Sequence, residues 1–163
     1  MLEQKEAYLL LGTNMGDRNS NLQQAIALIE SEIGNVIAAS SVYETAPWGK
    51  TDQPGFLNQA VGVQTALQPL ELLQVMLDIE KKMGRVRLEK WGERLIDIDL
   101  IFYGEDTILN NEELSLPHPE MHKRRFVLEP LNEIAADYIH PVFKEKVSSI
   151  LTNLSDELTV QKL

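Results

Sequence analysis

The sequence predicts an α+β fold in which a ferredoxin-like βαββαβ antiparallel sheet carries additional helices. Two observations lead to this prediction. Short apolar segments of strand length alternate with longer segments whose apolar residues recur at helical spacing. Their order along the chain is strand, helix, strand, strand, helix, strand, followed by further helical segments. We expect the helices of such a sheet to cover one of its faces.

The first strand and the first helix open this unit. Residues 6–11 form an apolar run that ends at Gly12, as is typical of a buried strand. Asn19 or Ser20 is expected to cap a helix that continues to about residue 32. The apolar residues of this helix recur at helical spacing, at Leu22, Ile26, Ile29 and Ile33.

Two strands and a loop follow the first helix. Residues 36–43 are β-branched and predict one strand, and residues 56–65 alternate and predict another. Residues 45–55 contain two prolines and two glycines, so we expect a long irregular loop there.

A second helix and a fourth strand complete the unit. Pro69 suits the first turn of a helix, and Gly84 suits the position just after its end. The face expected to be buried carries Leu70, Leu73, Leu77 and Glu80. In residues 95–103, isoleucine and leucine alternate with Asp97 and Asp99, which predicts a strand with one apolar and one acidic side.

The last third of the chain adds a loop and two helices. Pro117 and Pro119 predict an extended loop around His118. Residues 126–134 are expected to be helical in spite of Pro130, and residues 147–154 form a short amphipathic segment.

Composition narrows the class of protein. The 163 residues fit one domain, 1–163, and an apolar content of 44% is enough for a core. The chain has no cysteine, which excludes disulfides and thiolate metal sites and suits a cytoplasmic protein. A net charge of −10 argues against a nucleic-acid-binding protein. The apolar run at 8–11 is too short for a signal peptide or a membrane span, so we expect no membrane partner.

The positive charges are concentrated in spite of the acidic balance. Five of the six arginines lie in two stretches, which contain Arg85, Arg87 and Arg94, and Arg124 and Arg125. Clustered arginines suit a compact anion such as a phosphate group, although a solvated charged surface would look the same.

Asp97 and Asp99 are the sharpest chemical feature. Residues two apart on a strand point to the same side, so these carboxylates should lie side by side with Cα atoms roughly 7 Å apart. Two such carboxylates repel unless a cation lies between them, and Mg²⁺ binds one or two carboxylates together with water and phosphate oxygens. By themselves the two acids would also fit a solvent-facing strand. Together with Arg85, Arg87 and Arg94 they indicate a metal-dependent polyphosphate site.

The common phosphate-binding loops do not explain this site. Gly49, Lys50 and Thr51 resemble the end of a P-loop, but Glu44 stands where its first glycine is required. The segment 12–16 lacks the glycine spacing of a dinucleotide-binding fold. An ATP site in this chain is therefore of another kind.

An ordered set of motifs resembles the family of 6-hydroxymethyl-7,8-dihydropterin pyrophosphokinases, enzymes of folate biosynthesis. The motifs are Gly12-Thr13-Asn14, Tyr43-Glu44-Thr45-Ala46-Pro47, Asp52-Gln53-Pro54, Phe56-Leu57-Asn58, Gly84-Arg85-Val86-Arg87, Trp91-Gly92-Glu93-Arg94, Asp97-Ile98-Asp99, Leu116-Pro117-His118-Pro119, Arg124 and Phe126. They run in order from about residue 7 to about residue 136. None is decisive alone, but their combination is highly specific.

The resemblance implies a reaction, a metal and a nucleotide site. Pyrophosphate would pass from ATP to the hydroxymethyl group of the pterin, giving AMP, in a monomer that uses two Mg²⁺ ions. Asp97 and Asp99 would bridge both ions, and Arg85 and Arg94 would complete the catalytic group. The expected nucleotide contacts are Glu80, Arg87, Trp91, Ile98, His118 and Arg124.

The resemblance also implies a pterin pocket. Phe56 and Phe126 are expected to sandwich the flat ring, and the amide of Asn58 can both donate and accept hydrogen bonds at its pyrimidine edge. The expected rim consists of Thr45, Ala46, Pro47, Trp48 and Gly49. Without the resemblance, the two phenylalanines would fit an ordinary core and His118 an ordinary loop histidine.

Some residues depart from the family pattern, and two other functions stay open. Glu93 and Leu95 stand where proline and threonine are common, and Trp48 stands where a smaller aliphatic residue is common. One alternative is a non-catalytic ferredoxin-like module that binds a nucleotide, and the other is a different Mg²⁺-dependent phosphoryl or nucleotidyl transferase. The paired aspartates favour catalysis over the first, and the aromatic pair with Asn58 favours a pterin over the second.

Overall fold

The computed structural model describes residues 3–45, 55–84, 95–155 and 159–163. Its main sheet has the strands β1 (Lys5–Thr13), β2 (Gly34–Ala39), β3 (Tyr43–Thr45), β4 (Phe56–Thr65), β5 (Asp97–Tyr103) and β8 (Val160–Lys162). Two further strands, β6 (Leu109–Asn110) and β7 (Ser115–Leu116), form a small separate sheet. The helices are α1 (Arg18–Glu32), α2 (Pro69–Lys82), the 3₁₀ turn η1 (Met121–Lys123), α3 (Arg125–Ala135) and α4 (Val147–Thr152).

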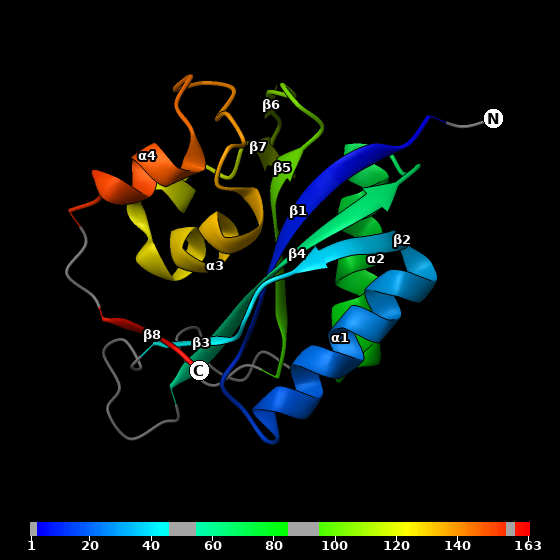
Figure 1. Ribbon diagram of the computed structural model, residues 1–163. Helices are drawn as coiled ribbons and strands as arrows, with labels where there is room; N and C mark the ends of the chain where they lie inside the picture. Colours follow the sequence, from blue (N-terminus) through cyan, green and yellow to red (C-terminus); the bar gives the residue numbers. More distant parts are fainter. Residues whose placement is uncertain (1–2, 46–54, 85–94, 156–158) are drawn as a thin grey trace.

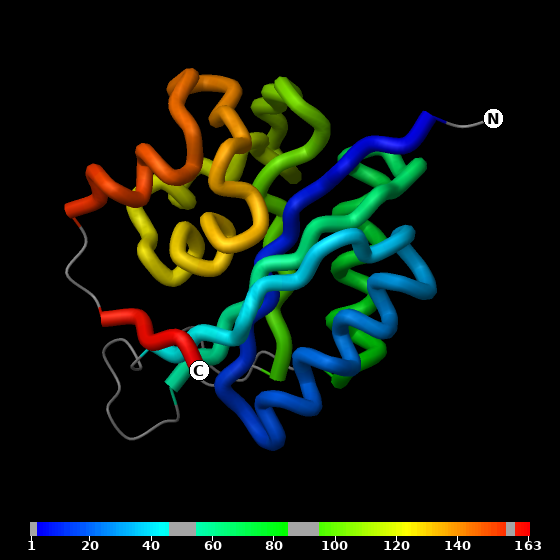
Figure 2. Tube along the Cα trace, viewed as in Figure 1, coloured from blue at the N-terminus to red at the C-terminus, as the bar shows by residue number. Residues whose placement is uncertain are grey.

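The main sheet is antiparallel and has the strand order β5-β1-β4-β3-β8. Strands β2 and β3 pair with the same edge of β4, each along a different half of it. The first four strands of the predicted unit therefore lie in the order expected of a ferredoxin-like sheet, with β1 and β4 at the centre, and the predicted α+β fold is confirmed. Figure 2 shows that the chain returns at its end to place β8 alongside β3.

Helices cover both faces of the sheet, not one. Figure 1 shows α1 and α2 on the first face and α3 and α4 on the second. Buried side chains form two clusters accordingly, one around Leu9 and Leu11 and the other around Leu10 and Phe102. The expectation of a single covered face is wrong because the second face of the sheet is also apolar, and the apolar side of α3 buries it.

The predicted strands are present, but 36–43 is divided into β2 and β3. The division falls at Ser40, whose Oγ accepts a hydrogen bond from the Ala60 amide at 2.9 Å. Ala39 pairs with Val61, and Tyr43 pairs with Asn58. Between these two pairs, the segment 36–43 has one residue more than β4. Such an extra residue interrupts the ladder as a bulge does.

The helices differ from the prediction in two details. Helix α1 is capped by Asp17, whose Oδ1 accepts from the Ser20 amide at 3.1 Å, so Asn19 and Ser20 are not the cap. On α2 the predicted buried face is correct at Glu80 but wrong at Leu70 and Leu77, which are 42% and 40% exposed. The buried residues of that helix are Leu72, Met76, Ile79 and Glu80. Helix α3 does continue through Pro130, as predicted. No helix in the described ranges is both long and apolar enough to span a bilayer.

Candidate active site

Two candidate residues, Asp97 and Asn58, lie in one row across the second face of the sheet. Asp97 of β5 pairs with Gly12 of β1, Gly12 pairs with Asn58 of β4, and Asn58 pairs with Tyr43 of β3. Because adjacent strands lie about 4.8 Å apart, Asp97 and Asn58 are separated by roughly 10 Å across the glycine.

Alternation on β5 directs both aspartates to this face. Ile96, Ile98 and Leu100 belong to the cluster under α1 and α2. Asp97 and Asp99 therefore point to the opposite face, where Asp97 is partly buried and Asp99 is exposed. The structure thus brings the two carboxylates together on one side of the strand.

Gly12 leaves room for the amide of Asn58. A Cβ atom at Gly12 would lie 2.9 Å from Nδ2 of Asn58, closer than ordinary contacts. Asn58 is only 5% exposed, and its Nδ2 donates to the carbonyl oxygen of Leu11 at 3.2 Å. A buried asparagine in a strand thus lies flat over a glycine, which fixes the direction of its amide.

Thr45 and two phenylalanines surround the other end of this row. Thr45 pairs with Phe56 and is 5% exposed, and its Oγ1 is buried without a hydrogen-bond partner among the described residues. A buried hydroxyl without a partner is uncommon and marks a place where a ligand can supply one. Phe56 and Phe126 are both partly exposed, and within the described part of the chain neither stacks on another ring. The guanidinium of Arg124 lies 5.7 Å from the centre of the Phe126 ring.

His118 lies near the acidic pair. Burial lowers the pKa of His118 from its ordinary value, the charge of Arg124 lowers it further, and the charge of Asp99 opposes both. Its Nδ1 accepts a hydrogen bond from the Glu120 amide at 3.2 Å, which assigns the proton of the neutral ring to Nε2. His118 is therefore a neutral donor close to Asp99 and Arg124.

A cavity of about 270 Å³ lies along the outer edge of β5. It is bounded by α2, β5, the β6–β7 hairpin and the loop that carries His118. Ile98, Asp99 and His118 line it together with residues that the sequence did not predict as part of a site, Leu73, Met76, Leu114 and Ser115 among them. Its mixed apolar and polar lining is typical of a small-molecule site.

Glu80 holds the backbone between the two aspartates. Its carboxylate is 4% exposed, and Oε2 accepts from the amide of Ile98 at 2.8 Å. Strand β5 is the last strand of the sheet on this side, so this amide has no neighbouring strand to pair with. Glu80 therefore replaces a strand partner next to Asp97 and Asp99.

The aspartate pair fits a metal that takes few ligands from protein. No cluster of three or more histidine, aspartate or glutamate ligands occurs among the described residues. A site with two carboxylates leaves the other positions for water and phosphate oxygens, which is the coordination that Mg²⁺ prefers.

Comparison with known proteins agrees with this arrangement. The model of the family described as 7,8-dihydro-6-hydroxymethylpterin-pyrophosphokinase (HPPK) matches residues 8–136. The chain belongs to the HPPK family.

Two relatives support the family assignment, and a solved structure supports the fold. A 2-amino-4-hydroxy-6-hydroxymethyldihydropteridine pyrophosphokinase of Haemophilus influenzae is 40% identical over 159 residues, covering 96% of this chain and 95% of the relative. The enzyme of the same name from Methylorubrum extorquens is 48% identical over 134 residues, or 82% and 84% of the two chains. Wild-type HPPK-DHPS of Plasmodium falciparum superposes with a TM-score of 0.74 at 20% identity, which shows the fold; the match covers 93% of this chain and 43% of that one.

Several predicted residues of this HPPK family member lie outside the described ranges. They are Arg85, Arg87, Trp91 and Arg94 of the expected catalytic and nucleotide group, and Ala46, Pro47, Trp48 and Gly49 of the expected rim. The described candidates form two groups. Asp97, Asp99, Ile98, Glu80, His118 and Arg124 gather around the start of β5, and Thr45, Phe56, Asn58 and Phe126 lie toward β3 and α3.

Proposed function

We propose that residues 1–163 act as one domain that transfers pyrophosphate from ATP to the hydroxymethyl group of 6-hydroxymethyl-7,8-dihydropterin, in folate biosynthesis. The family match over residues 8–136 and the names of the relatives support this reaction. The observation that carries it in the structure is the row that joins Asp97 to Asn58 across Gly12. In this row, the proposed metal site and the amide that would hydrogen-bond to the heterocycle lie about two strand spacings apart.

Asp97 and Asp99 would hold two Mg²⁺ ions together with the phosphates of ATP. When bound, these ions neutralise phosphate charge and lower the pKa of the substrate hydroxyl. The hydroxymethyl group gives up its proton, its oxygen attacks the β-phosphorus of ATP, the bond from that phosphorus to the α,β-bridging oxygen breaks, and AMP leaves with that oxygen. Arg85 and Arg94, assigned from their motifs, would bind the phosphoryl oxygens during the transfer.

The pterin is assigned to the second face of the sheet near β3 and β4. Phe56 and Phe126 would stack on the two faces of the ring, and the amide of Asn58 would hydrogen-bond to its polar edge. The Oγ1 atom of Thr45, which lacks a partner among the described residues, can receive or donate a hydrogen bond there. Residues 46–49 are assigned to the rim from their motif.

The nucleotide base is assigned to the cavity beside β5. Ile98 would contact the base, and the Nε2–H group of His118 and the guanidinium of Arg124 would donate to ribose or phosphate oxygens. Arg87 and Trp91 are assigned to the same nucleotide from their motifs. Glu80 contributes indirectly, since it holds the amide of Ile98.

The test identifies the nucleotide product. Protein, Mg²⁺, ATP and 6-hydroxymethyl-7,8-dihydropterin are mixed, and AMP is expected, whereas ADP would refute pyrophosphoryl transfer. Asp97→Ala and Asp99→Ala should each lower turnover by at least about a thousandfold in folded protein, since several kcal/mol of charge stabilisation depends on them. Asp78→Ala, at an exposed position of α2, is the matched control and should keep full turnover.

Two further properties are part of the proposal. The enzyme is proposed to act in the cytoplasm, which the absence of cysteine suits, and as a monomer. Light scattering at micromolar concentration should give the mass of one 18.5 kDa chain, and a dimer mass would refute the monomer.

A further inference from the structure

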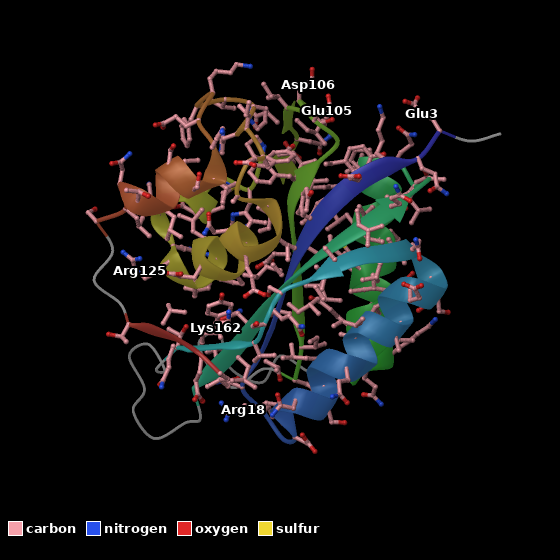
Figure 3. All side chains as sticks on the ribbon, viewed as in Figure 1. Glu3, Arg18, Glu105, Asp106, Arg125 and Lys162 are labelled. Atoms are coloured by element: carbon pink, nitrogen blue, oxygen red, sulfur yellow. The ribbon has the colours of Figure 1, made fainter. Side chains whose placement is uncertain are left out.

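The carboxylate of Glu133 ties helix α3 to strand β3 and the residues just before it. Its Oε1 accepts from the Tyr43 hydroxyl at 2.7 Å, and its Oε2 accepts from the amide and hydroxyl of Ser41 at 2.8 and 3.2 Å. Lys162 of β8, labelled in Figure 3, places its ammonium 3.7 Å from Oε1. Burial raises the pKa of Glu133, but the hydrogen bonds from Tyr43 and Ser41 lower it below its ordinary value, so an ionised carboxylate accepts these bonds.

These contacts adjoin the proposed pterin residues on two elements. Tyr43 pairs directly with Asn58 and is two residues from Thr45 on the same strand. Phe126 lies seven residues before Glu133, so both side chains are on the same side of α3, about two turns apart. The bonds of Glu133 therefore join the helix that carries one proposed ring contact to the strand beside the others.

A ring between Phe56 and Phe126 needs a defined gap. Each face of the ring contacts a phenyl group at about 3.5–4.0 Å, so the two phenyl rings must lie roughly 7–8 Å apart. Apolar surfaces tend to close such a gap, because contact between them removes area from water. Three hydrogen bonds accepted by one carboxylate restrict both the height and the rotation of α3 over β3.

We propose that Glu133 is a positioning residue for the pterin. Through Tyr43 and Ser41 it holds α3 at the distance from β3 that the ring requires, and it does so before the ring enters. The inference rests on the proposed function, and Glu133 itself acts without touching either substrate.

Tyr43→Phe tests this inference, because it removes the hydroxyl and keeps the ring. The matched control is Tyr138→Phe, which removes another hydroxyl on the second face, one that donates to the carbonyl oxygen of Gly104 at 2.5 Å. Tyr43→Phe should raise the KM for the pterin about three- to tenfold and leave the KM for ATP within twofold. Tyr138→Phe should lower the melting temperature by about as much as Tyr43→Phe does, but it should leave both KM values within twofold.

A second variant distinguishes the positioning role of Glu133 from a contribution to general stability. In Glu133→Ala the KM for the pterin should rise at least as much, and adding Tyr43→Phe should then change it by less than twofold, since the partner is already lost. An unchanged KM for the pterin in Tyr43→Phe, or equal increases for both substrates, overturns the inference even if Glu133→Ala does not fold. Absence of AMP formation by the wild-type protein would instead refute the proposed function, so the two failures are distinct.

Discussion

Replacing Gly12 by alanine should separate pterin binding from ATP binding. The new Cβ atom would lie 2.9 Å from Nδ2 of Asn58, whereas ordinary contacts begin at 3.4 Å. The amide therefore has to move by about 0.5 Å or the strands have to separate. The hydrogen bond from Nδ2 to the carbonyl oxygen of Leu11 is already 3.2 Å long, so this shift takes it out of range.

The magnitude follows from the burial of the amide. Asn58 is 5% exposed, and a buried polar group without its hydrogen bond costs about 1–3 kcal/mol. The lower chain entropy of unfolded alanine offsets about 0.4–1 kcal/mol of that in stability. This entropy difference does not offset the loss of pterin affinity that the displaced amide causes. We therefore expect a pterin Kd about 10- to 100-fold higher, an ATP Kd within twofold, and a loss of about 1–2 kcal/mol in the free energy of unfolding.

Titration calorimetry with the pterin, in the presence of Mg²⁺ and a non-hydrolysable ATP analogue, measures the first quantity. Gly62→Ala is the matched control, because its Cβ would lie 3.2 Å from the Tyr8 ring on the same face but away from Asn58. In an Asn58→Ala background, Gly12→Ala should cause no further loss of pterin affinity. A folded Gly12→Ala protein with a pterin Kd within twofold of wild type would refute the reasoning.

Three further predictions concern charged and titratable groups. Glu80→Leu should lower the free energy of unfolding by about 1–3 kcal/mol and reduce turnover, because the amide of Ile98 loses its acceptor. Glu80→Gln keeps an acceptor and should lose less stability. Equal urea midpoints for the two variants would contradict this prediction. Arg18→Gln should cost about 1–3 kcal/mol in urea denaturation, since Arg18 is only 28% exposed and donates both to Glu44, which is 34% exposed, and to the carbonyl oxygen of Gly55 at 2.8 Å; a loss below about 0.5 kcal/mol would contradict it. Burial and the nearby charge of His122 lower the pKa of His140 to about 4, so the unfolded chain binds its proton first as the pH falls. Stability should therefore be full above pH 6.5 and decrease by up to about 3 kcal/mol toward pH 4, and His140→Asn should flatten this pH profile.

Local patterns were sufficient for the parts of the site that depend on one element. Asp97 and Asp99 could be assigned to one side of a strand because alternation with isoleucine is a rule of the single chain segment. The role of Gly12 depends on which residue of β4 lies opposite, and cross-strand register is not contained in either segment alone. On α2 the sequence offers two apolar faces, and packing on the sheet selected Leu72 and Met76 over Leu70 and Leu77.

In the proposed mechanism, the position of the aspartates at the edge of the sheet lets them serve two substrates. On one side of Asp97 the sheet continues through Gly12 to Asn58, where the pterin is assigned. On the other side the sheet ends, and the cavity assigned to the nucleotide begins along β5. An edge strand would ordinarily leave its outward amides without partners, but Glu80 from α2 accepts the one between the two acids. The acidic pair is thus held rigidly from the helix while both of its flanks stay accessible, which is the arrangement that transfer between two separately bound molecules requires.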